Sequence, residues 1–192
     1  MFSIKKSIQS LSRTFLSVLL FICLAYQPLF SQVINFSIHV ASSLDATKDA
    51  DMAFPQVSAG DGLTAINLGD GGMGVFAISG NEELDIEVIL TAPAELVHTT
   101  KPSNTMGLDL KFAYANTGVN DINVAKTVNG NSARFQLRER TSGPAGAPPT
   151  PPNSSHVPNI TTAYIYLYGS INVGNISSGN YSGTVDLSVQ YY

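Results

Sequence analysis

The last fourteen residues of the chain, from Gly179 to Tyr192, constrain the fold more than any other stretch. The segment opens with glycine, asparagine and serine, and apolar residues then alternate strictly with polar ones. The apolar set is Val185, Leu187, Val189 and Tyr191. A period of two predicts a β-strand with one buried and one exposed face. Because a chain end is ordered only when it is docked, we expect this strand to complete a sheet or to pair with a partner.

Residues 1–31 have the features of an export signal. Three basic residues precede an apolar run over residues 14–26. That run is shorter than the roughly 20 apolar residues that a membrane-spanning helix needs. We therefore predict a signal peptide over residues 1–31 and a secreted mature chain, residues 32–192, with no membrane span after signal removal. Ala25 marks the alternative cleavage position.

Removal of this segment leaves an acidic chain without cysteine. Seven lysines and arginines then stand against 14 acidic residues, a net charge of about −7, and the single cysteine, Cys23, lies in the removed part. This charge has the wrong sign for a nucleic-acid partner. The absence of thiols excludes disulfides, thiol catalysis and thiolate metal sites in the mature chain. About 160 residues are enough for one domain with its own core.

Short apolar runs punctuated by Gly, Asn and Pro cover most of the mature chain. About ten strands are predicted in this way, which is typical of an all-β fold, an antiparallel β-sandwich or another closed sheet. They lie at residues 34–40, 52–54, 63–68, 75–79, 84–90, 108–114, 122–128, 133–137, 162–173 and 184–191. Asn129-Gly130 is the strongest hairpin signal and predicts that the strands on either side of it pair with each other.

Residues 141–159 are the one low-complexity segment, with six of the ten prolines of the chain among Gly, Ser and Ala. Proline cannot donate a hydrogen bond to a strand ladder, and this composition cannot build a core. We expect an exposed, extended loop. It is either a recognition loop or a tolerated insertion.

Few residues carry recognisable chemistry. Residues 69–74 match the pattern G-x-G-x-x-G, but the sequence predicts a strand after them rather than a helix, so we expect a hairpin turn and not a nucleotide site. Glu83, Asp85 and Glu87 share the outer side of a predicted strand, which is typical of a solvated face. The three histidines are far apart, and no nucleophile elbow is present. We predict no enzyme activity, no cofactor and no metal.

The predicted strand over residues 162–173 carries two apolar faces. Tyr164, Tyr166 and Tyr168 alternate with aliphatic residues. If the aliphatic side chains form the core, the three tyrosines are displayed outward and offer a binding face for a carbohydrate or a host protein. The alternatives are that both faces are covered, or that the tyrosines are core and the aliphatic face meets another subunit.

The terminal strand resembles that of chaperone–usher pilus subunits. In that family a glycine fourteen residues from the end and a penultimate tyrosine frame alternating hydrophobic residues, and here Gly179 and Tyr191 frame the ladder Val185, Leu187 and Val189. Residues 168–183 are also similar to a family of exported bacterial domains of unknown function that is related to spore-coat U and pilin-like domains. A weaker similarity extends to residues 52–54 and 75–80. The disulfide of pilins is missing.

The resemblance implies an immunoglobulin-like sandwich that lacks one strand. Its groove would be filled first by a strand of a periplasmic chaperone and then by the N-terminal extension of the next subunit, by β-augmentation. Ile34, Phe36, Ile38 and Val40 have the alternation of such a donor strand. Equally, these four residues are the first strand of the chain's own sandwich.

These observations together predict a structural subunit of pilin or fimbrial type, active in cell adhesion. It would lie in the periplasm or on the surface of a Gram-negative bacterium, and its partners would be a chaperone and like subunits. The alternative is a self-contained secreted β-sandwich that binds a carbohydrate or a protein.

Overall fold

The computed structural model describes residues 33–40, 44–140 and 159–192, and of Val33, His39 and Val40 it describes the backbone alone. The strands all fall in one compact unit, Ser31–Tyr192. The predicted signal peptide lies outside the described residues, as does all but the last residue of the predicted proline-rich loop. Both remain predictions.

Eleven strands and one short 3-10 helix make up the described chain, so the prediction of an all-β fold is confirmed. All but one of the described strand pairs are antiparallel, as expected; the exception is β1, which lies parallel to β11. The elements are β1 (Val33–Val40), β2 (Asp45–Ala50), β3 (Gly62–Ile66), β4 (Gly74–Asn81), β5 (Asp85–Thr91), β6 (Glu95–His98), β7 (Thr105–Ala115), η1 (Ile122–Val124), β8 (Lys126–Thr127), β9 (Ser132–Gln136), β10 (Ile160–Val173) and β11 (Tyr181–Tyr191).

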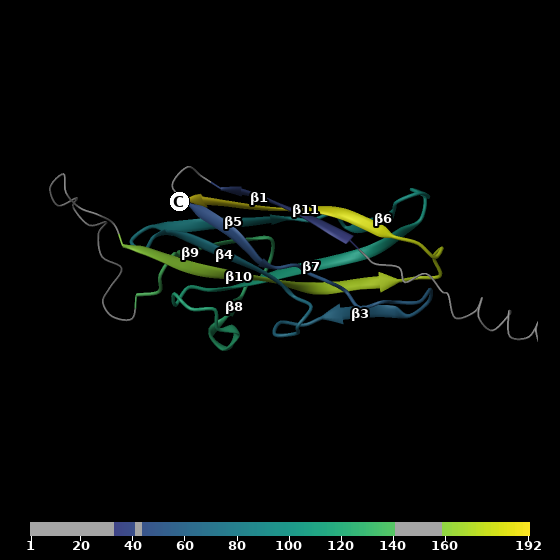
Figure 1. Ribbon diagram of the computed structural model, residues 1–192, viewed down its shortest axis with the longest axis horizontal. Helices are drawn as coiled ribbons and strands as arrows, with labels where there is room; N and C mark the ends of the chain where they lie inside the picture. Colours follow the sequence, from purple (N-terminus) through teal and green to yellow (C-terminus); the bar gives the residue numbers. More distant parts are fainter. Residues whose placement is uncertain (1–32, 41–43, 141–158) are drawn as a thin grey trace, which may run out of the picture. The chain divides into compact units, whose positions relative to one another are not determined.

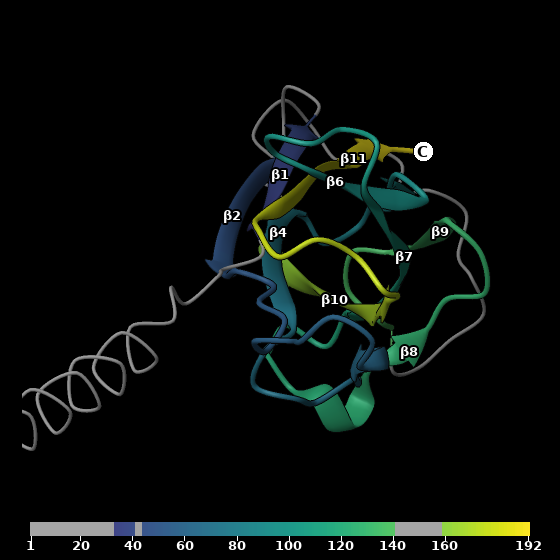
Figure 2. The same ribbon diagram turned by 90° about the vertical axis from the view of Figure 1, so that its right-hand side faces the viewer.

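The strands form one continuous sheet that bends into two layers. Hydrogen bonding runs in the order β2-β4-β10-β7-β6-β11-β5-β9, and β6 connects the layers because it pairs with both β7 and β11. Figure 1 shows β1, β11 and β5 in one layer, with β4, β10 and β7 in the other. Figure 2 shows β1, β6 and β11 facing β10 across the interior.

The core lies between the two layers and follows the alternation of the sequence. β5 and β11 each bury every second side chain, as a half-buried strand should. The facing layer contributes Phe76 from β4, Phe112 from β7, and Ile165 and Leu167 from β10, all with no exposed surface. Burial of these apolar side chains is the main source of stability in a fold without disulfides.

β10 is the longest strand and carries two partners in succession along one edge. β4 pairs with Ile160–Leu167 and β3 with Gly169–Val173. Residues 67–73 leave this edge after β3 and return to it as β4, so the predicted hairpin at residues 69–74 is wrong. Gly169 lies where the partner changes. A side chain there would collide with the backbone carbonyl of Asp109, and its φ of +158° suits glycine.

β2 is an edge strand of a different character from β1. Its six residues are mainly exposed and polar, and its register against β4 shifts between Lys48 and Ala50. Lys48 also pairs with Asp51 at 2.6 Å. Charged residues and a bulge are features that keep an edge strand from pairing with other chains.

Two further strand predictions are wrong. Residues 52–54 are not in a strand, although Met52 and Phe54 are buried. Residues 122–128 form η1 and the two-residue β8 instead of a full strand. The predicted Asn129-Gly130 hairpin is also absent, because the strands on either side of it do not pair with each other. β8 pairs with β7, whereas β9 pairs with β5 in the other layer. The local turn signal is present, but the chain uses it to cross between layers.

Candidate strand-addition site

β1 lies along β11 for its whole length. The parallel register runs from Val33 opposite Ser182 to Val40 opposite Val189. β5 pairs with Asp186 to Tyr191 of the same strand, so β5 and β1 occupy opposite edges of β11. Among the strands that the structure describes, β1 pairs with β11 alone. The first predicted strand of the mature chain is therefore an edge strand bound on one side.

The inward side chains of β1 extend the core between the layers. Ile34 is buried, and Phe36 and Ile38 are half-buried, beside the fully buried aliphatic residues of β11. The ring of Phe36 meets the ring of Phe76 on β4 edge to face, with centroids 5.7 Å apart. β1 thus closes the interior along the edge of β11, and its polar residue Asn35 faces solvent.

Tyr191, the penultimate residue, ties the end of β11 to the opposite layer. Its hydroxyl accepts a hydrogen bond from the backbone N–H of Asn81, the last residue of β4, at 2.8 Å. Tyr191 pairs with Ile86 of β5 within its own layer. A tyrosine at this position therefore holds both layers together where β11 ends.

Gly179, just before β11, packs against a buried histidine. A side chain at Gly179 would collide with the ring of His98, which is 4% exposed. Nδ1 of His98 accepts hydrogen bonds from the backbone N–H groups of Thr100 and Lys101, both at 3.1 Å, and Nε2 lies 3.2 Å from the carbonyl oxygen of Ser178. The histidine joins the turn after β6 to the entry of β11, and only glycine leaves room for it.

A polar cluster covers the outer face near the end of β11. Arg134 of β9 donates to Glu87 of β5 at 2.8 Å, and Gln190 of β11 donates to the same carboxylate at 2.9 Å. The guanidinium also lies 3.7 Å from the ring centroid of Tyr192. The hydrogen bonds from Arg134 and Gln190 lower the pKa of Glu87, and the pKa of Arg134 is raised by the same partner. Three neighbouring strands are linked here.

The tyrosines of β10 are only partly displayed. Tyr166 has no exposed surface, and its hydroxyl donates to Oδ1 of Asn120 at 2.8 Å. Burial raises the pKa of this phenol. Tyr164 and Tyr168 are half-buried and pack, with Tyr166, in a small second core on the outer side of β10. Of the alternatives left open by the sequence, outward display does not hold for Tyr166, where both faces of the strand are covered.

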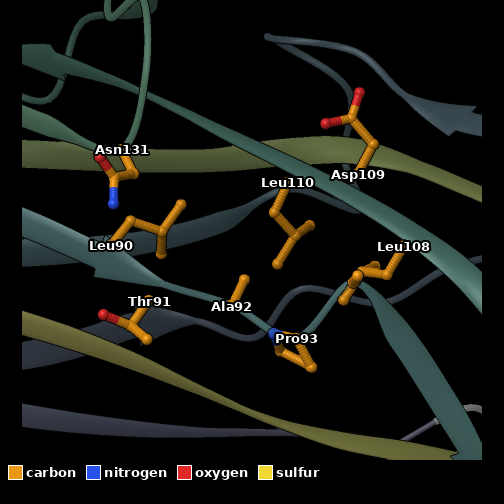
Figure 3. A pocket seen from close by; sticks show the side chains of 9 residues that line it. Leu90, Thr91, Ala92, Pro93, Leu108, Asp109, Leu110 and Asn131 are labelled. Carbon is orange, nitrogen blue, oxygen red and sulfur yellow. The ribbon is translucent and has the colours of Figure 1, made fainter.

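A pocket of about 310 Å³ lies where β5 ends and the chain turns toward β6. Figure 3 shows Leu90, Leu108, Leu110 and Pro93 converging on it, while Asp109 points away. The complete lining is Leu90, Thr91, Ala92, Pro93, Ala94, Leu108, Asp109, Leu110 and Asn131. This pocket could not be predicted from the sequence, because its walls come from three segments that meet only in the fold.

Within residues 33–40, 44–140 and 159–192, no three His, Cys, Asp or Glu residues are grouped so that they could hold a metal ion. The same part of the chain contains no helix that is long and apolar enough to cross a membrane.

Comparison with known proteins gives weak likenesses. No family model matches the chain, and no curated protein matches it. Among solved structures the chain is similar to one described as a chaperone–tip adhesin complex vital for synergistic activation of CFA/I fimbriae biogenesis. This likeness has a TM-score of 0.36 and 12% identity and covers 78% of this chain, which spans only 43% of the other.

A second similar structure is the CooA pilin subunit from enterotoxigenic Escherichia coli. Its TM-score is 0.32 and its identity is 10%, over 83% of this chain and 90% of that one.

Proposed function

We propose that this chain is a secreted or cell-surface structural subunit of pilin type that assembles by β-strand addition and has no catalytic activity. One observation carries the proposal: the N-terminal strand β1 is an edge strand, paired in the described chain with β11 alone, and it places alternate apolar side chains in the core. A strand bound in this way is a separable part of the sandwich. Another chain with the same alternation fits the same edge.

The edge that β1 covers is the natural acceptor. Without β1, the aliphatic face of β11 and the backbone groups of one of its edges would be exposed. Fully burying one large apolar side chain contributes about 1.5–3 kcal/mol, so the buried Ile34 and the half-buried Phe36 and Ile38 together contribute about 3–6 kcal/mol. This is close to the total stability of many domains, about 5–15 kcal/mol. A vacant groove would therefore be both unstable and adhesive.

The proposed partners are other copies of this chain and a periplasmic chaperone, each of which offers a strand to β11. The proposed location is the periplasm or the cell surface of a Gram-negative bacterium, to which the predicted signal peptide over residues 1–31 would deliver the chain. The mature chain has no cysteine, so its folding in that compartment would rest on its core and not on a disulfide.

The test compares the mature chain, residues 32–192, with a version that begins at Asp45 and lacks β1. We expect the shortened chain to be unstable alone, and to regain cooperative unfolding when a peptide of residues 32–44 is added. A peptide with Phe36→Asp and Ile38→Asp is the matched control and should give no rescue. The mature chain should form oligomers as its concentration rises, measured by light scattering after size-exclusion chromatography.

Two results would contradict the proposal. One is a mature chain that stays monomeric at every concentration and takes up no added peptide. The other is a shortened chain that is as stable as the mature one, since β1 would then contribute nothing to the groove.

The pairing of β1 with β11 also favours a second function. Because β1 completes the sandwich of its own chain, the molecule can also be a self-contained binding domain for a carbohydrate or a protein. Its site would be the half-buried Tyr164 and Tyr168 or the apolar pocket around Leu110. A stable monomer whose ligand binding is lost in Tyr168→Ala, but kept in Phe36→Leu, would select this function.

A further inference from the structure

The orientation of β1 raises a question about the site proposed above. β1 runs parallel to β11, and it does so within the same chain, with Phe36 opposite Val185 and Ile38 opposite Leu187. β2 begins only five residues after the end of β1 and belongs to the other layer, where it pairs with β4. The strand that would join another copy is therefore already paired with β11 of its own chain.

The side-chain pattern of β1 does not depend on strand direction. Successive side chains of a strand point to opposite faces, so residues 34, 36 and 38 face the core whether the strand runs parallel or antiparallel. Parallel pairing is slightly less stable per residue than antiparallel pairing. The bound strand has another advantage, since a short tether gives it an effective concentration in the millimolar range. Strength of pairing favours an incoming antiparallel strand, and the tether favours the chain's own strand.

We propose that β1 is a removable cap on its own groove: the chain occupies its acceptor edge with its own strand in parallel register, and this strand must leave before a strand of a second copy can join β11. The inference rests on the proposed function and adds its regulation. Strand release, and not the encounter of two subunits, then limits the rate of assembly.

A disulfide lock tests this in the full mature chain. Asn35 and Thr184 are directly paired in the parallel register, and both side chains are exposed, so Asn35→Cys with Thr184→Cys places two cysteines on adjacent strands. Strands lie about 4.8 Å apart, within the range of a disulfide. The mature chain contains no other cysteine. The control pair is Asn35→Cys with Gln190→Cys, about 20 Å apart along the strand direction in this register.

The readout is uptake of a labelled peptide of residues 32–44. We expect the lock to form within one chain, and the oxidised chain to take up no peptide. The reduced chain should take up the peptide, and the rate of uptake should reach a plateau as the peptide concentration is raised, because release of β1 limits that rate. Phe36→Ala should speed uptake at least tenfold, since each 1.4 kcal/mol of lost binding is about a factor of ten. Asn35→Ala should leave the rate unchanged.

Three outcomes would overturn the cap. The first is cysteines that join two chains instead of one, the second is an oxidised chain that takes up peptide as fast as the reduced chain, and the third is no peptide uptake by either form. Failure of the proposed function is a separate result, read from light scattering. Copies of the reduced chain would then never associate, even though peptide uptake still depends on the lock.

Discussion

Replacing Phe36 by alanine measures how much β1 contributes to the folded chain. A fully buried phenylalanine costs about 3–5 kcal/mol when cut to alanine. Phe36 is half-buried, so about 2–3 kcal/mol is expected, which includes its edge-to-face contact with Phe76. For a domain of about 160 residues, each kcal/mol shifts Tm by about 2–4 °C, so Tm should fall by about 4–12 °C.

The assay is urea unfolding of residues 32–192, monitored by circular dichroism. Calorimetry gives the corresponding Tm. Asn35→Ala is the control, because this neighbouring side chain is exposed, and it should change stability by less than about 0.5 kcal/mol. A double-mutant cycle with Phe76→Leu should give a coupling of about 0.5–1.5 kcal/mol. If Phe36→Ala costs no more than Asn35→Ala, or the coupling is zero, the Phe36 side chain does not pack between the layers in solution.

Three further predictions concern the surroundings of β11. Gly179→Ala should cost about 2 kcal/mol or more in urea unfolding because the added methyl meets a buried ring. Gly174→Ala, where the added methyl would only touch the side chain of Ile176 at 4.0 Å, should cost less than about 1 kcal/mol; equal costs would refute the contact. Glu87 has a lowered pKa, so its contribution to stability is present above the unfolded-state value near 4.5 and is lost as pH falls through the folded-state value; Glu87→Gln should lose less stability on acidification, and an unchanged pH dependence would count against the cluster. Tyr166 has a raised pKa, so its contribution is present below pH 10.0 and is lost as pH rises through the folded-state value; Tyr166→Phe should resist alkali better in the same assay, and an identical alkaline loss would contradict its burial.

The strands with strict alternation could be predicted from the sequence. β5 and β11 were expected at residues 84–90 and 184–191 and lie at Asp85–Thr91 and Tyr181–Tyr191. Their polar and apolar residues differ clearly, so the buried face is set by local sequence. The register and direction of β1 could not be predicted in this way, because an alternating strand fits a partner in either direction.

The failures have one physical cause, which is that pairing partners are decided over long distances in the chain. Asn129-Gly130 encodes a turn, but whether its flanking strands pair with each other depends on β7 and β5. Both faces of β10 are apolar, and the sequence does not show which face is packed against other segments of the chain. Tyr166 is buried because Asn120 and its neighbours lie over it.

The contrast between three edge strands of the sandwich has a consequence for geometry. β2 is polar, bulged and charged, and β9 is only five residues long, whereas β1 has eight residues and alternates apolar side chains with polar ones. If the chain assembles by strand addition as proposed, joining is confined to the β1 side of each molecule. Units with a single receptive side and a single donated strand would then associate head to tail and extend into an unbranched filament instead of a two-dimensional array or a clump.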